Sequence, residues 1–372
     1  MRLWLAPSAF YPSIGGVEEL SLKLAQHWLE DGVEVTVITN RWPADLPPSE
    51  TVNGVPVRRI AFPLPGRHPR SWFPYVAGRR RAARELLALG PPPDLVHFQC
   101  LSSQLPHLAE FAYRRSIPTV LTTQGEVVMD AGRLYQISPY MRRALRRYAA
   151  SAGALTACSR WTASATAGVA PAFADAEVIL NGVDLDDWRV TRLPDEPVLA
   201  AWGRHVPQKG FGVLLEAFRH VKTVMPQARL LLGGSGPLTE GLRRAAPPDV
   251  EFLGALNRLQ VDDMLARARV VVVPSRIEPF GIVAVEALAA GRGLVYAAGT
   301  GLEEAAGGRG RAADASHPHS LALALVEELR RPTPAAEGRA RAEELVWTNI
   351  SSEYRRVHKR VIAQAAAGGP DL

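Results

Sequence analysis

Two carboxylates, Glu278 and Glu286, lie at the ends of the segment Glu-Pro-Phe-Gly-Ile-Val-Ala-Val-Glu. The apolar run 270–273 before it is typical of a buried strand, residues 274–281 are rich in breakers, and 282–290 have helical composition. Ligands of parallel α/β sheets bind beyond the carboxyl ends of the strands, and a helix that begins after a glycine offers free N–H groups to a phosphate. Glu286 could then bind a ribose diol and Glu278 the hydroxyls of a hexose. The segment predicts a sugar-nucleotide site.

The spacing alone leaves a simpler alternative open, because the helix dipole favours an acid such as Glu286 near a helix start and Glu278 could be a solvated loop acid. Arg204 and Lys209 favour the sugar-nucleotide site. They lie just before a predicted amphipathic helix, 211–224. Arg as a bidentate fork and Lys as a point charge can converge on a diphosphate and stabilise its charge as a sugar–phosphate bond breaks. Without the first segment, two exposed basic loop residues would be the default interpretation.

Four segments together resemble glycosyltransferase family 4. Glu278-Pro-Phe-Gly followed by Glu286 resembles the family's E-x7-E signature, and Gly-Arg-His-Val-Pro-Gln-Lys-Gly, which holds Arg204 and Lys209, is similar to its diphosphate-binding segment. Gly15-Gly16 resembles its N-terminal glycine loop, and the run from Asn181 to Asp184 resembles its interdomain segment. The four occur in the family's order. The resemblance implies a retaining enzyme of the α/β GT-B fold, with two facing Rossmann-like, doubly wound parallel-sheet domains.

The resemblance also assigns roles to residues. Arg204, Lys209 and Glu278 are expected to be catalytic, the first two on the diphosphate and the third on the sugar hydroxyls. The donor-binding residues that it implies are Gly15, Gly16, Gly236, Leu253, Phe280, Gly281, Ile282 and Glu286. No metal or cofactor is required, because fixed cations and helix-start amides can stabilise the leaving diphosphate. The donor is expected to be a nucleoside diphosphate sugar, with UDP the most common nucleotide in the family.

Two further residues are expected to position the sugar or the acceptor. His97 ends a predicted strand, as in many family members, although a packed structural histidine is an equal alternative. Gln124 stands where the family commonly has His, and it can hydrogen-bond but cannot titrate, so we expect a positioning role only. Glu126 and Asp130 follow in the same loop, either as acceptor contacts or as plain loop acids.

The glycine turn 233–237 after an apolar run could suggest a dinucleotide fold. It does not complete G-x-G-x-x-G, and no acid follows at the expected place, so the motif for NAD is absent. In the resembled family this turn and the segment 252–254 border the nucleotide.

The composition is that of a globular protein: 372 residues, 47% hydrophobic and 22% charged, long enough for two domains. The two cysteines, Cys100 and Cys158, lack metal-site spacing and argue against a disulfide framework. Neither a signal peptide nor an apolar run of about 18 residues is found, so we expect a cytoplasmic protein.

The first half alternates strands and helices, and a turn-rich polar stretch separates it from a second half that restarts with an apolar strand. We expect an acceptor-side domain at 1–190, a donor-side domain at 191–346, and an amphipathic C-terminal helix at 347–372 that packs back on the first domain.

Positive charge is unevenly placed in this chain of net charge +6. Residues 58–90 hold eight arginines against one acid, with Trp72, Phe73 and Tyr75 among them, and 141–148 form a second basic helix. Such a surface suits peripheral contact with an anionic membrane at its inner face, whereas the alternative is a set of solvated helix faces. Nucleic acid is disfavoured because no binding motif accompanies the charge.

We therefore expect a retaining glycosyltransferase that moves a sugar from a nucleoside diphosphate sugar to a hydroxyl acceptor. A lipid-linked or cell-envelope precursor and a small molecule or natural product are both open as acceptors. The alternatives are a GT-B nucleotide-sugar epimerase or hydrolase, and a non-catalytic sugar-nucleotide-binding protein.

Overall fold

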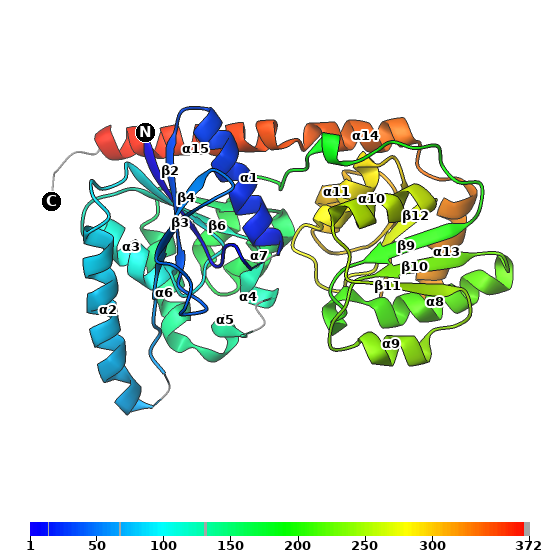
Figure 1. Ribbon diagram of the computed structural model, residues 1–372, viewed down its shortest axis with the longest axis horizontal. Helices are drawn as coiled ribbons and strands as arrows, with labels where there is room; N and C mark the ends of the chain where they lie inside the picture. The colour runs from blue at the N-terminus through cyan, green and yellow to red at the C-terminus, as the bar shows by residue number, and fades with distance from the viewer. Residues whose placement is uncertain (14, 67, 130–131, 368–372) are drawn as a thin grey trace. The chain divides into compact units, whose positions relative to one another are not determined.

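The computed structural model describes residues 1–13, 15–66, 68–129 and 132–367 (Figure 1). Arg67 and Asp130, both singled out in the sequence, lie outside the described residues. The chain divides into two compact units, one formed by Met1–Ile179 with Trp347–Leu372 and the other by Leu180–Val346.

The first unit is built on an eight-stranded sheet of order β3-β4-β2-β1-β5-β6-β7-β8. All neighbouring strands are parallel except the antiparallel pair β3 and β4. The strands are β1 (Arg2–Pro7), β2 (Glu34–Asn40), β3 (Ser49–Val52), β4 (Val55–Ile60), β5 (Leu95–Gln99), β6 (Thr119–Thr123), β7 (Ala154–Ala157) and β8 (Glu177–Val178).

The α-helices of the first unit connect these strands and include the last helix of the chain. They are α1 (Gly16–Glu30), α2 (Trp72–Leu87), α3 (Leu105–Tyr113), α4 (Glu126–Met129), α5 (Leu134–Ile137), α6 (Pro139–Ala150), α7 (Arg160–Ala167) and α15 (Trp347–Ala367), with short 3-10 turns at Pro69–Ser71 and Pro171–Asp175. The central strand β5 is buried along its whole length, as expected for a parallel strand that is covered on both faces.

The second unit has a six-stranded, fully parallel sheet of order β11-β10-β9-β12-β13-β14. Its strands are β9 (Val198–Trp202), β10 (Arg229–Gly233), β11 (Val250–Gly254), β12 (Val270–Val273), β13 (Gly293–Ala297) and β14 (Arg311–Ala313). Its helices are α8 (Phe211–Val224), α9 (Thr239–Ala245), α10 (Arg258–Arg267), α11 (Ile282–Ala289), α12 (Leu302–Ala306), α13 (Pro318–Arg330) and α14 (Ala335–Glu344), with 3-10 turns at Leu185–Asp187 and Pro207–Lys209.

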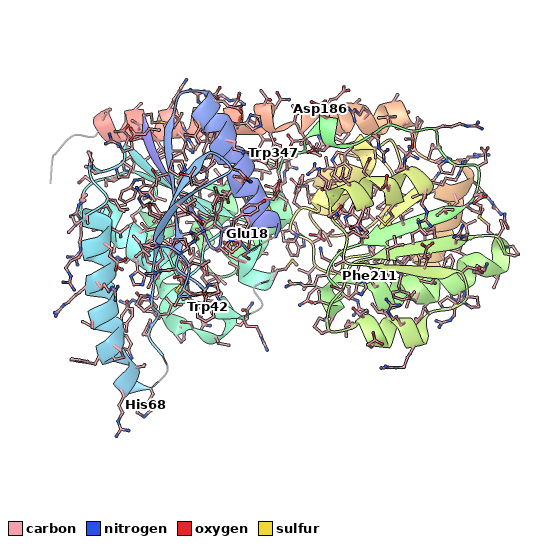
Figure 2. The ribbon with its side chains drawn as sticks, in the orientation of Figure 1. Glu18, Trp42, His68, Asp186, Phe211 and Trp347 are labelled. Carbon is pink, nitrogen blue, oxygen red and sulfur yellow. The ribbon has the colours of Figure 1, made fainter. Side chains whose placement is uncertain are left out.

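The C-terminal helix α15 packs against α1 of the first unit (Figure 1). It begins at Trp347 (Figure 2), and the indole N–H of Trp28 in α1 donates to the backbone oxygen of Ser351 at 3.2 Å. Ile350, Tyr354, Val357 and Val361 are buried along one face of α15, which is the helical spacing seen in the sequence.

The stretch before β9 belongs to the second unit from residue 180 onward, whereas the sequence placed the boundary at 190. Val183 pairs with Val346 in a parallel bridge, and Arg258 forms an ion pair with Asp187. Arg292, almost fully buried, donates to the oxygen atoms of Thr191. These contacts fix the polar segment to the second unit, although its composition is that of a linker.

Candidate active site

Four neighbouring strands of the second sheet bring the predicted donor-site residues to one edge. Arg204 follows β9, Gly236 follows β10, Leu253 lies near the end of β11, and Glu278 follows β12. Because the sheet is parallel, the carboxyl ends of these strands meet at the same edge. The predicted residues of this unit are therefore gathered at one place.

Close approach of backbone to backbone holds the loops of this edge together. A Cβ atom on Gly210, whose φ is +70°, would lie 2.0 Å from the carbonyl oxygen of Pro274, and one on Gly301 would lie 1.9 Å from that of Pro279. The N–H of Arg276 also donates to the carbonyl of Gln208 at 2.8 Å. Only glycine fits at the two positions, so the loops after β9, β12 and β13 form one packed layer.

Lys209 and Glu278 are the charged pair at the centre of this layer. The Lys209 Nζ lies 2.6 Å from Oε2 of Glu278, and the two side chains are 21% and 9% exposed. The Glu278 carbonyl accepts the N–H of Gly301 at 2.9 Å, which fixes its backbone. The pair thus holds an ammonium group, mostly withdrawn from water, in a loop that precedes α8, which begins at Phe211 (Figure 2).

Arg204 is exposed, and its guanidinium has no hydrogen-bond or ion-pair partner among the residues that the structure describes. The next residue, His205, is fully buried. Its ring nitrogens lie 3.0 Å from the hydroxyl of Thr239 and 3.3 Å from the carbonyl of Gly233, and its backbone N–H donates to Ser235. His205 therefore joins the loop after β9 to the loop after β10. The sequence interpretation gave it no role, although it stands inside the quoted diphosphate segment.

The start of α11 carries the remaining donor-site residues of the second unit. Gly281 caps the helix in the left-handed region, with φ of +90°, while Phe280 before it is buried. The first N–H groups of a helix have no partner inside it, so those of Ile282 and Val283 can bind an anion, whereas that of Ala284 donates to the Gly281 carbonyl. Glu286 is half-buried, about one turn further along the helix.

In the first unit, Gly15 and Gly16 lie at the start of α1. Gly15 is the residue before the helix, and a Cβ on Gly16 would meet nothing within 4 Å. The hydroxyl of Ser13 donates to Glu18 (Figure 2) at 2.9 Å, and that of Tyr11 donates to Glu19. The loop is thus tied to the first turn of α1 by two carboxylates.

His97 does not reach the surface. It is fully buried in the middle of β5, its Nε2 lies 2.7 Å from the hydroxyl of Thr122, and its Nδ1 lies 3.0 Å from Nε2 of His358 in α15. Trp28 and Tyr354 pack beside its ring. Burial lowers the pKa of His97 to about 3. This is the environment of a structural histidine, the alternative that the sequence left open, and it offers no contact to a ligand.

Gln124 and Glu126 lie just beyond β6. Glu126 is buried, and its carboxylate accepts the backbone N–H groups of Leu101 at 2.9 Å and of Gln124 at 2.7 Å. Burial raises the pKa of Glu126, against the effect of these bonds. Glu126 therefore fastens the loop after β5 to the loop after β6, and of the two residues only Gln124 keeps a partly exposed side chain.

Within the described ranges, no three His, Cys, Asp or Glu side chains are grouped so that they could hold a metal ion. In the same residues no helix is both long and apolar enough to cross a bilayer.

Two family models match the two halves of the chain. The model of Glycosyltransferase Family 4 matches residues 14–187, and that of Glycosyl transferases group 1 matches residues 196–331. The chain belongs to glycosyltransferase family 4. It is a glycosyltransferase that uses a nucleotide-sugar donor, and the resemblance seen in its four sequence segments is confirmed.

Curated relatives match across both units. A GDP-mannose-dependent alpha-(1-6)-phosphatidylinositol dimannoside mannosyltransferase of Mycobacterium tuberculosis is 27% identical over 95% of this chain and 94% of its own length. A GDP-mannose:cellobiosyl-diphosphopolyprenol alpha-mannosyltransferase of Xanthomonas campestris is 29% identical over 76% of this chain and 74% of its own length.

Solved structures confirm the predicted fold class. Sucrose-phosphate synthase from Thermosynechococcus elongatus has a TM-score of 0.77 at 21% identity, covering 98% of this chain and 99% of that one. HepE of Anabaena, solved with UDP and glucose, has a TM-score of 0.73 at 18% identity, covering 96% and 99%. The glycosyltransferase thus has the GT-B fold, with two parallel α/β sheets and C-terminal helices.

Proposed function

We propose that this glycosyltransferase moves a sugar from a nucleoside diphosphate sugar to a hydroxyl acceptor and retains the anomeric configuration. The observation that carries the proposal is the ion pair of Lys209 and Glu278, 2.6 Å apart within the packed loops of the second sheet. A fixed ammonium group there can stabilise the diphosphate as it leaves. Its partner carboxylate is then available to the sugar hydroxyls.

The other residues of the second unit would complete the donor site. Arg204, exposed and unpaired in the described part of the chain, would bind the diphosphate as a second cation. The N–H groups from Phe280 to Ile282 would assist it, and Glu286 would hold the ribose. Gly236 and Leu253, on the neighbouring strands, would border the base.

The first unit would supply the acceptor side of the reaction. Gly15 and Gly16 would approach the donor, and Gln124 would position the sugar by hydrogen bonds alone. His97 is left out of this assignment, because its ring is enclosed.

Two nucleotides remain candidates for the donor. UDP is the prediction from the sequence, and it occupies the solved HepE structure. GDP-mannose stands in the names of the relatives from Mycobacterium tuberculosis and Xanthomonas campestris. Those relatives also name a phosphatidylinositol mannoside and a diphosphopolyprenol as acceptors, which favours a lipid-linked acceptor here.

Product analysis tests the reaction class. The protein would be incubated with UDP-glucose or GDP-mannose, with and without polyprenyl diphosphate sugars or phosphatidylinositol, and the products followed by NMR. We expect nucleoside diphosphate release to rise when an acceptor is added, and the new linkage to keep the α configuration of the donor. Rapid acceptor-independent consumption would instead support the epimerase or hydrolase alternative, and binding without turnover would support the non-catalytic one.

A further inference from the structure

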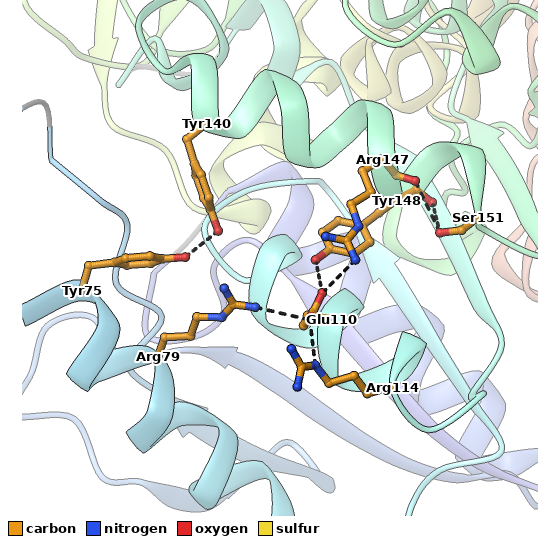
Figure 3. Close-up of polar contacts among 8 residues, drawn as sticks. All are labelled: Tyr75, Arg79, Glu110, Arg114, Tyr140, Arg147, Tyr148 and Ser151. Carbon is orange, nitrogen blue, oxygen red and sulfur yellow. Dashed lines mark hydrogen bonds and ion pairs between the residues drawn. The ribbon is translucent and has the colours of Figure 1, made fainter. Parts of the chain in front are cut away.

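Helix α2 stands at the outer side of the first unit (Figure 1) and has two faces. Its inner face packs on α3 and β4, with Tyr75, Ala82 and Leu86 buried. The Tyr75 hydroxyl lies 2.6 Å from that of Tyr140 in α6 (Figure 3), so the helix is anchored to the body of the unit.

The outer face of α2 exposes large apolar side chains. Phe73 is 84% exposed, Leu87 53% and Val76 41%, although each would gain from leaving water. Helical spacing puts Arg80 and Arg84 on the same side as Phe73, at the seventh and eleventh positions after it. Apolar and cationic groups therefore share one solvent-facing stripe, which we call the outer stripe: Phe73, Val76, Arg80, Arg84 and Leu87.

The arginines of the outer stripe keep their charge unpaired in the described part of the chain. There, neither Arg80 nor Arg84 has an acidic partner, while Arg81 pairs with Glu85 at 2.8 Å.

On the inner side, one carboxylate serves three arginines (Figure 3). Glu110 of α3 lies 2.7 Å from Arg114, 3.4 Å from Arg147 and 3.5 Å from Arg79, and it also accepts the Tyr148 hydroxyl at 2.9 Å. Burial opposes ionisation of Glu110, but the bonds from Arg114 and Tyr148 lower its pKa. The area around α2 therefore keeps a surplus of positive charge.

Some arginines that the sequence grouped with this surface are used elsewhere. Arg59 is buried against Glu50, and the α6 residues Arg142 and Arg146 donate to backbone carbonyls. In the described part of the basic region, the outer stripe of α2 is where exposed apolar side chains and arginines without an acidic partner lie together.

We infer that the outer stripe of α2 docks on an anionic lipid bilayer. A helix that lies in a membrane interface buries its apolar side chains at the headgroup boundary and sets its arginines among anionic lipids, which is the combination that the stripe offers. The exposed apolar side chains of the stripe would stay in water on a hydrated nucleic-acid duplex, so the duplex would not stabilise them. The inference rests on the proposed function, because docking on a bilayer would bring the enzyme to a lipid-linked acceptor.

Sedimentation with liposomes tests the inference. The wild type would be mixed with vesicles of phosphatidylcholine alone or with 30% phosphatidylglycerol, beside the triple variant Phe73→Ser, Arg80→Gln, Arg84→Gln. The matched control is Leu323→Ser, Arg330→Gln, Arg331→Gln, which likewise changes one apolar residue and two arginines, at exposed positions of α13 and just after it.

We expect the wild type and the control to sediment with the anionic vesicles only, and added salt to release them. Loss of each arginine should lower the partition coefficient for anionic vesicles about fivefold. Loss of the Phe73 ring should lower it by a further factor of roughly ten. The inference would be overturned if the α2 variant sediments as well as the wild type, or if the wild type binds neutral and anionic vesicles equally. It would also be overturned if the wild type does not sediment. So would a dimer that Phe73→Ser dissociates, or displacement from vesicles by duplex DNA.

A nucleotide thermal shift on the same proteins separates this inference from the proposed function. If the wild type and the α2 variant are both stabilised by donor nucleotide but neither sediments, only the membrane inference fails. If the wild type sediments but no nucleotide stabilises it, only the proposed donor site fails.

Discussion

The carboxyl edges of the two sheets are built alike but use their polar residues differently. At the second sheet, Arg204 is exposed, and Lys209 keeps a partly accessible ammonium group beside the buried Glu278. At the first sheet, Glu126 bonds backbone N–H groups, and His97 behind that edge is sealed by α15. The second edge thus has cationic side chains that can bind a ligand, whereas at the first edge Glu126 and His97 bind other parts of the protein.

This difference predicts which substitutions should change turnover and which should change the stability of the fold. Charged residues of the second edge should affect turnover with little loss of fold, while its glycines should affect folding. The buried polar groups of the first unit should affect stability and its pH dependence alone.

The largest effect is expected from Lys209→Ala. Loss of one fixed donor to a developing anion typically costs about 10²- to 10³-fold in turnover, and we expect that loss in donor-dependent transfer. The matched control is Lys222→Ala, since Lys222 also makes a 2.6 Å ion pair, with Asp249, away from the proposed site. Comparable losses in the two variants, or less than a tenfold loss for Lys209→Ala, would contradict the assigned role.

The next effect concerns the packing of the second edge. In Gly210→Ala the new methyl would lie 2.0 Å from the Pro274 oxygen at a φ of +70°, so we expect a loss of about 3 kcal/mol in unfolding free energy. Gly212→Ala, two residues later in α8, meets nothing within 4 Å and should stabilise by about 0.5–1 kcal/mol. Urea denaturation measures both, and a Gly210→Ala protein as stable as the wild type would show that the loops do not need this contact.

The buried histidines predict a pH effect on the first unit. Burial lowers the pKa of His97 to about 3 and places that of His358 well below its usual range, and neighbouring Arg355 adds to the latter. Below pH 6.5 these histidines bind protons in the unfolded chain but stay neutral in the folded protein. The free energy of unfolding is therefore highest above pH 6.5 and falls as the pH drops. The slope should approach about 1.4 kcal/mol per pH unit for each histidine.

His358→Gln should make this dependence shallower, whatever it does to stability at neutral pH. Melting temperatures between pH 7 and pH 4.5 measure the slope, and His319→Gln, at an exposed site of α13, is the control. An unchanged slope in His358→Gln would show that the pair does not carry the effect.

The smallest effect on stability is expected from Gly16→Ala. A Cβ there meets no atom within 4 Å, so the free energy of unfolding should change by less than about 0.5 kcal/mol. If the loop approaches the donor as proposed, the added methyl should still raise the KM for the donor roughly tenfold. A clear loss of stability with an unchanged KM would show that Gly16 has a structural role and does not contact the donor.

Much of the fold follows from local patterns in the sequence. The strand at 270–273, the breaker-rich loop and the helix from Ile282 lie where hydrophobic runs, Gly281 and helical composition placed them. The order of segments also indicated the family. These features depend on neighbours in the chain, so a single sequence carries them.

The rest depends on contacts between distant residues. Nothing near His97 indicates that His358 closes over it, and nothing near Lys209 shows that its amine meets Glu278. Likewise, the arginines of α6 look like a solvated basic face, but carbonyls reached through the fold bind two of them. Residue type and spacing therefore indicated which groups could do chemistry, but not which of them the fold uses internally.

A nucleotide thermal-shift comparison tests the donor site most directly. UDP, GDP, ADP and dTDP would be added to the wild type, Lys209→Ala, Glu286→Ala and the Lys222→Ala control. At a hundredfold excess over Kd, one nucleotide should stabilise the wild type and the control by about 2.7 kcal/mol, and neither Lys209→Ala nor Glu286→Ala should respond. A full shift in Lys209→Ala, or no shift in the wild type with any nucleotide, would contradict a donor site at the carboxyl edge of the second sheet.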